Sequence, residues 1–242
     1  MSRYCSILVF IFTILSLAAV SIPASAQPVI VNGGFETGTF AGWTVMVATD
    51  SNGDWNVYQG NQFPPLPPPP DGQYAATTFQ SGPGAQVLYQ DIAVPETGPF
   101  NCSLIVYYDN EASEFIIGPG LEFTGDPNQQ ARIDLLTDSD PFTVSAGVLE
   151  NLFQTLPGDP PTLGYTTIEF DLSPYAGTTV RLRAAEVDNQ EVFLFAIDEV
   201  TCVGGTVATG IPTLGEWGLM AMAGVLGIAG LLYTRRRRMT NA

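Results

Sequence analysis

Short alternations of apolar and polar residues recur along the middle of the 242-residue chain. They are rich in β-branched and aromatic residues and are separated by turns of Gly, Pro, Asn and Asp, which is the pattern of β-strands. No segment of comparable length has a helical apolar period. Ten strands are predicted, over residues 28–32, 43–49, 55–59, 74–79, 85–92, 102–109, 130–137, 165–171, 179–187 and 192–202. This pattern favours an all-β fold, an antiparallel two-sheet β-sandwich or jelly roll.

One predicted strand carries two of the chain's few basic residues. Val180, Leu182 and Ala184 alternate with Arg181 and Arg183. Alternation of this kind predicts a strand with one buried face and one face in solvent.

The N-terminus has the layout of a secretory signal peptide over residues 1–26. Arg3 precedes an apolar run from residue 7 to residue 20, and Ala24-Ser25-Ala26 is a small-x-small cleavage site. Gln27 would then begin the mature chain. The alternative is an uncleaved N-terminal anchor.

The C-terminus predicts a membrane span. Residues 217–233 contain no charged residue over 17 positions, about 25 Å as a helix. The four arginines at 235–238 would hold the end of the chain in the cytoplasm. A buried core helix is the alternative. The predicted organisation is a β-sandwich domain over 27–202, a flexible linker over 203–210 and a C-terminal segment over 211–242.

That C-terminal segment resembles the IPTL-CTERM sorting signal. The resemblance rests on a short motif, an apolar helix and an arginine cluster in sequence; the motif residues are Ile211, Pro212, Thr213, Leu214, Glu216, Trp217 and Gly218. It implies a substrate of an exosortase in a Gram-negative bacterium, exported across the inner membrane. The span would be a transient anchor, removed when the ectodomain passes to the cell surface or extracellular matrix. Signal peptidase and exosortase are then the expected processing partners.

The acidic net charge of the chain and its lack of His and Lys exclude several functions. The chain has 24 acidic residues, 8 basic residues and no His, for a net charge of −16, and all the basic residues are Arg. Residues 27–210 hold 23 of the acids and 3 arginines, a net charge of −20. Without His and Lys, histidine-dependent catalysis, imidazole metal sites and Schiff-base chemistry are excluded. So acidic a chain is also unsuited to nucleic acid. We therefore expect a non-enzymatic protein with no catalytic residues.

A second resemblance spans the middle of the chain. The opening residues 31–38, VNGGFETG, followed by Gly42-Trp43, resemble the start of galactose-binding-like jelly rolls, which include many carbohydrate-binding modules. The segment 172–177, LSPYAG, and the closing 197–200, IDEV, resemble the end of the same folds.

This resemblance implies a structural calcium ion. Glu36 and Asp198 would be its ligands, with backbone carbonyls of Gly34 or Gly38. Calcium takes six to eight hard oxygens, and extracellular concentrations fill modest sites. The alternative is that Glu36 hydrogen-bonds a turn and Asp198 caps a strand.

Two cysteines remain once the signal is removed. Cys102 opens one predicted strand and Cys202 ends the last. In an oxidising compartment they can form a disulfide that closes a loop of about 100 residues, worth roughly 4 to 5 kcal/mol. Two free thiols are the alternative.

Three functions follow. The first is an exported, surface-sorted, non-enzymatic sandwich at the cell surface or in the matrix, with a glycan or calcium as ligand. The second is a carbohydrate-binding module proper, which predicts a platform of two or three exposed aromatic residues. The third is a secreted glycan hydrolase, which predicts two carboxylates facing each other across a cleft.

Overall fold

The computed structural model describes residues 30–59, 66–79 and 82–204, together with Gly224 and Ile228. The predicted signal peptide, the linker after residue 204 and the membrane span lie outside these residues, apart from Gly224 and Ile228, which are helical. Among the described residues no helix is long and apolar enough to cross a membrane.

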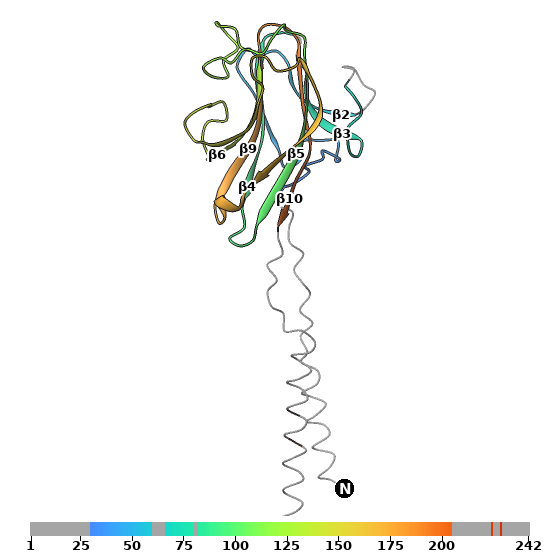
Figure 1. Ribbon diagram of the computed structural model, residues 1–242, viewed down its shortest axis with the longest axis vertical. Coiled ribbons are helices and arrows are strands. Elements are labelled where there is room, and N and C mark those ends of the chain that lie inside the picture. The colour runs from blue at the N-terminus through green and yellow to red at the C-terminus, as the bar shows by residue number, and fades with distance from the viewer. Residues whose placement is uncertain (1–29, 60–65, 80–81, 205–223, 225–227, 229–242) are drawn as a thin grey trace, which may run out of the picture.

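The described residues between 30 and 204 contain ten strands and one short 3-10 helix (Figure 1). They are β1 (Thr44–Val47), β2 (Asp54–Gln59), β3 (Tyr74–Phe79), β4 (Gly84–Ala93), β5 (Phe100–Asn110), β6 (Gln130–Leu136), β7 (Val148–Gln154), β8 (Thr162–Asp171), η1 (Ser173–Tyr175), β9 (Thr179–Asp188) and β10 (Phe193–Gly204).

The strands form two antiparallel five-stranded sheets. The first sheet has the order β1-β4-β9-β6-β7 and the second the order β2-β3-β10-β5-β8. Figure 1 shows the sheets packed face to face. The predicted all-β, two-sheet jelly roll is confirmed.

Nine of the ten predicted strands are present. The exception is 28–32, whose described part, Ile30–Asn32, forms bends. The strand that was not predicted, β7, is an edge strand whose pairing with β6 shifts register twice. Its sequence VLENLFQ therefore does not alternate, because the irregular register breaks the two-residue period. β10 continues to Gly204, two residues into the predicted linker.

The core lies between the sheets and is made of the inward residues of both. On β10, Phe193, Phe195 and Ile197 point inward and are at most 2% exposed. Phe153 of β7 stacks on Phe195, with ring centroids 6.3 Å apart. The apolar alternation seen in the sequence is therefore the inner face of each strand.

The expectation of a solvent face on β9 is wrong. Arg181 is 6% exposed and Arg183 is completely buried. The 137–147 loop covers them: Arg181 Nη1 donates to Ser139 O at 2.8 Å, and Arg183 Nη1 donates to Pro141 O at 2.6 Å. An alternation of Arg with apolar residues predicts that the Arg side of the strand faces solvent. Here each guanidinium has carbonyl and carboxylate acceptors that allow its burial.

The charge of the two buried arginines is balanced by carboxylates. Asp134, on the same sheet, is bound by both Arg132 and Arg183 and is fully buried. Arg181 Nε donates to Asp91 at 2.7 Å and its guanidinium lies 4.1 Å from the centre of the Tyr89 ring. Pairs of this kind within the sheet fix each guanidinium, so that its remaining N–H groups can bind the loop carbonyls.

The outer face of the second sheet carries a tyrosine cluster. Tyr58, Tyr107 and Tyr165 lie there with Leu194 and Ala196. The proline-rich segment at residues 64–70, PPLPPPP, packs onto the cluster through its described residues, because the Tyr58 hydroxyl donates to Leu66 O and the Tyr165 hydroxyl donates to Pro67 O, each at 3.1 Å. The described part of the proline-rich segment is therefore anchored to the sheet.

The predicted disulfide is confirmed. Cys102 and Cys202 face each other on β5 and β10 and are bonded, with Cα atoms 4.0 Å apart. The bond fastens the end of the last strand to its neighbour, next to the point where the chain leaves the sandwich.

Candidate calcium site

The opening motif folds into a tight turn in front of β1. Asn32 and Phe35 both have left-handed backbone conformations, with φ of 51° and 55°. Asn32 stabilises the turn, since its Nδ2 donates to Thr39 O at 2.8 Å and its carbonyl accepts from Phe35 N at 3.2 Å. The Phe35 ring is fully buried against Trp43, 5.4 Å away between centroids. The buried Phe35 ring and the hydrogen bonds of Asn32 thus fix the direction in which the next residue, Glu36, points.

Gly33 brings this turn against the last strand. Val200 N donates to Gly33 O at 3.0 Å, and a Cβ at position 33 would lie only 1.9 Å from Val200 O. The strand is irregular here, because its register with β5 shifts between Asp198 and Thr201 and Glu199 has a φ of 48°. The absence of a side chain at Gly33 allows the bulged strand and the opening turn to meet.

The Glu36 carboxylate accepts hydrogen bonds at the start of β3. Gln73 N lies 2.9 Å and Tyr74 N lies 3.0 Å from Oε1. Gly72 is in contact as well, since a Cβ there would fall 2.2 Å from Oε1. The alternative role considered for Glu36, hydrogen bonding to a turn, is thus present in the structure. A carboxylate has about four lone-pair positions, so these bonds leave it able to accept a further partner.

Asp198 sits on the outer face of the second sheet and is 1% exposed. Its Oδ1 accepts from Glu199 N at 2.8 Å, whereas its buried Oδ2 has no hydrogen-bond donor among the described residues. Burial, followed by the neighbouring carboxylates of Glu199, Glu36 and Asp71, raises the pKa of Asp198 to about 7. The site therefore concentrates negative charge on a carboxylate that water does not reach.

Gly34 lies where the two predicted acidic ligands meet. A Cβ at Gly34 would be 3.7 Å from Glu36 Cγ and 3.9 Å from Asp198 Oδ1. Gly38, the other predicted carbonyl donor, instead faces the Tyr74 ring, with a Cβ position 3.5 Å from it. The geometry thus brings Gly34 close to both Glu36 and Asp198, and a ligand role for the carbonyl of Gly34 or Gly38 stays a prediction.

Two acids near this site were not predicted as site residues. Asp71 and Glu199 both add to the negative field at Asp198. Their positions in the sequence could have identified them as site residues: Asp71 follows the proline run, and Glu199 is directly beside Asp198. Within the described part of the chain no three acidic, His or Cys side chains form a group that could hold a metal. Backbone carbonyls and water would therefore have to complete a calcium shell here.

The tyrosine cluster adjoins the same carboxylate. Tyr107 and Tyr165 rings lie 5.2 Å apart between centroids. Burial, and after it the carboxylate of Asp198, raises the pKa of the Tyr165 hydroxyl. Tyr58 and Tyr107 are 4% and 6% exposed, so their rings are not open to a sugar. Trp55 and Tyr108, two other aromatic residues of the sandwich, are also buried.

Comparison with known proteins identifies a sequence motif at the C-terminus. Residues 209–238 match the IPTL-CTERM motif. The sorting signal predicted from the sequence is therefore confirmed, and it marks the chain as an exported, surface-sorted protein. The match covers the tag and not the sandwich. No curated protein matches the chain.

The sandwich is similar to several solved structures. One is the carbohydrate-binding module TmCBM61, solved in complex with β-1,4-galactotriose, with 15% identity, TM-score 0.46 and coverage of 74% of this chain and 99% of that one. Another is the K1 cleaved adhesin domain of Lys-gingipain from Porphyromonas gingivalis, with 12% identity, TM-score 0.47 and coverage of 71% and 95%. A third is the C-terminal family 22 carbohydrate-binding module of Clostridium thermocellum Xyn10B, with 14% identity, TM-score 0.43 and coverage of 76% and 99%.

Proposed function

We propose that this chain is a non-enzymatic component of the bacterial cell surface or extracellular matrix, whose sandwich domain holds a structural calcium ion between Glu36 and Asp198. The sorting signal at 209–238 supports delivery to the surface. The burial of Trp55, Tyr58, Tyr107 and Tyr108 supports a scaffold more than an aromatic binding platform. The lack of His and Lys supports a role without catalysis.

The calcium proposal rests on the environment of the Asp198 Oδ2 atom. It is buried, lacks a donor among the described residues, and is surrounded by other carboxylates. A hard divalent cation would neutralise that charge and join the opening turn to the last strand through Glu36 and Asp198. Because the ion would connect two segments that are distant in sequence, it would act on stability rather than on chemistry.

Thermal melting of the full-length chain in detergent tests this proposal. We expect the wild type, stripped with a chelator, to melt at a lower temperature than in millimolar calcium. Asp198→Asn should show a smaller difference, because it loses the contribution of this site. Asp138→Asn is the matched control, since it removes the same charge from a side chain that is 93% exposed. Equal calcium responses in the Asp198→Asn variant and the wild type would contradict the assignment.

Surface sorting has its own test. We expect mass spectrometry of the mature protein to find both ends processed, with Gln27 first and the C-terminal arginine cluster removed. An intact tail at 235–238 in the surface fraction would contradict processing by an exosortase.

Glycan binding is the second candidate function, and the position of Tyr165 favours it. This tyrosine is half-buried and lies beside Tyr107 and Asp198 on an outer sheet face. A partly exposed ring beside a carboxylate can stack on a sugar and accept from its hydroxyls. A glycan array probed with the wild type and with Tyr165→Ala, with and without chelator, tests the idea. Signals that survive Tyr165→Ala unchanged would exclude this face.

A further inference from the structure

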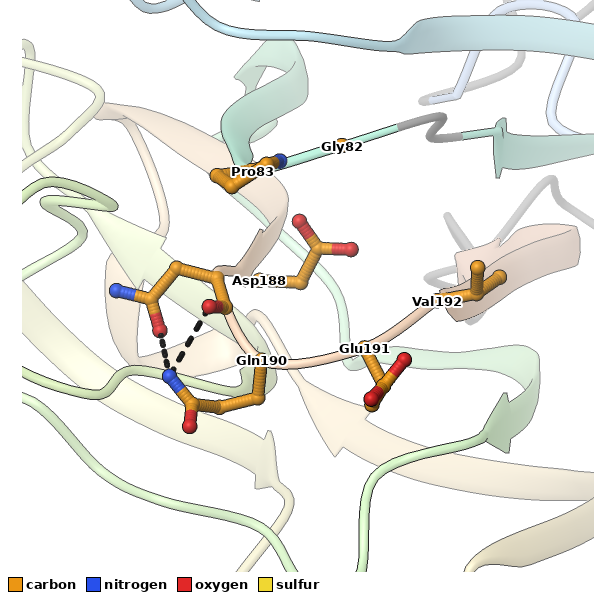
Figure 2. Close-up of a pocket in the computed structure, with 7 residues that line it drawn as sticks. Gly82, Pro83, Asp188, Gln190, Glu191 and Val192 are labelled. Carbon is orange, nitrogen blue, oxygen red and sulfur yellow. Dashed lines mark hydrogen bonds between the residues drawn. The ribbon is translucent and has the colours of Figure 1, made fainter.

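A pocket opens where β9 turns into β10, and it takes no part in the site described above. It has a volume of about 180 Å³ and is lined by the turn residues 188–192 and by Gly82 and Pro83, which precede β4. Figure 2 shows the Asp188 carboxylate pointing toward Gly82 and Pro83, between the two segments that line the pocket. We call it the turn pocket.

Asp188 supplies a buried acceptor to the turn pocket. The residue is 3% exposed, and none of the described residues donates to its Oδ1. The backbone N–H groups of Gly84 and Phe193 favour its ionised form, but burial outweighs them and raises its pKa to about 7. A buried carboxylate oxygen without a donor is a position where a cation supplies the compensating interaction.

Further buried oxygen atoms lie two residues along the same strands. Glu186 points to the same inner face two residues earlier and is fully buried. Gln86, its partner in the β4–β9 register, donates from Nε2 to Glu186 Oε2 at 2.9 Å. The Gln86 Oε1 atom is buried and receives no hydrogen bond from the described residues. This end of the sandwich interior is therefore acidic and rich in oxygen, unlike the apolar core.

The arginines of the sandwich are engaged elsewhere. Arg132 and Arg183 pair with Asp134, and Arg181 pairs with Asp91 and Asp138. Because these are the three basic residues between 27 and 210, none of them makes an ion pair with Asp188. Among the described residues, no basic side chain balances a charge on Asp188.

We propose that the turn pocket binds a calcium ion through the Asp188 carboxylate, with Glu191 and the side-chain amide of Gln190 among the residues that line it. The donors are carboxylates and amides, without His or Cys, which suits a hard cation and not zinc. The irregular turn suits calcium better than magnesium, because calcium accepts six to eight oxygens in variable geometry. The ion would fasten the β9–β10 turn to the segment that begins β4, so this site is independent of Glu36 and Asp198.

Direct counting of bound calcium tests the proposal. Full-length protein in detergent is stripped with a chelator and dialysed against calcium at pH 7.5, and the bound ion is then measured by elemental mass spectrometry. We expect Asp188→Asn to bind one ion fewer than the wild type, or to bind it at least tenfold more weakly. Asp138→Asn should bind as the wild type does. A folded Asp188→Asn variant with unchanged calcium content and affinity would overturn the proposal.

Two further variants make the result specific. Asp198→Asn should keep the ion of the turn pocket, so failure of the Glu36–Asp198 site would leave this result intact. If Asp188→Asn does not fold, Glu191→Gln in the pocket lining replaces it, and we expect a several-fold weaker affinity with an unchanged circular dichroism spectrum. Wild-type affinity in Glu191→Gln would then overturn the proposal.

Discussion

Asp198→Asn should change how stability depends on pH, and the sign follows from the structure. Burial and nearby carboxylates raise the pKa of Asp198 from 3.8 to about 7 in the folded protein. Between these values the folded state keeps a proton that the unfolded state releases. The contribution of Asp198 to stability is therefore fully present below about pH 4 and is lost as pH rises to about 7.

The size of the effect comes from the same two values. A change from 3.8 to about 7 corresponds to about 4 kcal/mol of unfolding free energy. In the Asp198→Asn variant the side-chain amide carries no charge at any pH, and its oxygen can still accept from Glu199 N, which in the wild type bonds Oδ1 at 2.8 Å. Without calcium, the variant should therefore gain stability relative to the wild type by up to about 4 kcal/mol between pH 4 and pH 8.

Urea unfolding at pH 4.5, 6 and 8 with chelator measures this difference. Comparing variant with wild type isolates Asp198, because Asp188, whose pKa is also raised, is present in both. Calcium at one hundred times its Kd stabilises the wild type by about 2.7 kcal/mol, so at pH 8 it should reduce the variant's advantage of about 4 kcal/mol without reversing it. Parallel pH profiles of the two proteins in chelator would refute the reasoning.

Three other substitutions test the packing. Gly33→Ala would place a Cβ 1.9 Å from Val200 O; we expect a loss of about 1–3 kcal/mol or more of unfolding free energy, measured by urea unfolding, with Gly164→Ala as a control whose Cβ meets no atom within 4 Å. Arg183→Met leaves the buried Asp134 with one arginine, Arg132, and the amide of Asn151, so we expect a loss of about 3 kcal/mol of unfolding free energy and faster proteolysis of the 137–147 loop. Replacing both bonded cysteines by Ala opens a separation of 100 residues; we expect a loss of about 4–5 kcal/mol in non-reducing urea unfolding, and an unchanged midpoint would contradict the entropic argument.

The strands that could be predicted from the sequence are those in which inward-facing apolar residues alternate with outward-facing residues. β3, β4, β5 and β9 each place apolar residues of one parity in the core, so their two-residue period is visible in the sequence. β7 could not be recognised, because its register shifts twice and it lies at a sheet edge. The burial of Arg183 could not be predicted from the sequence for a different reason. It depends on carbonyls of Pro141 and Thr143, forty residues away, and no local pattern reports such a contact.

The candidate site divides in the same way. Glu36 and Asp198 were found because the first and last motifs of a jelly roll meet across the sandwich, and the structure brings both close to Gly34. Gly38 has a left-handed φ of 67° and lies against the Tyr74 ring, and its role as a carbonyl ligand stays a prediction. Asp188 could not have been chosen from the sequence. Its neighbours in the chain resemble any polar hairpin turn, and only the packing of Gly82 and Pro83 over it creates the pocket.

The distribution of charge gives these acids a shared consequence. All three arginines of the sandwich are buried in pairs with Asp91, Asp134 and Asp138, two of them under the 137–147 loop. The remaining carboxylates, including the buried Asp188 and Asp198, therefore have no arginine partner within 4 Å among the described residues. A domain with this arrangement repels itself at neutral pH and gains from any hard cation in its surroundings. Delivery to the cell surface, where calcium is available at millimolar concentration, is the setting in which that charge becomes an advantage.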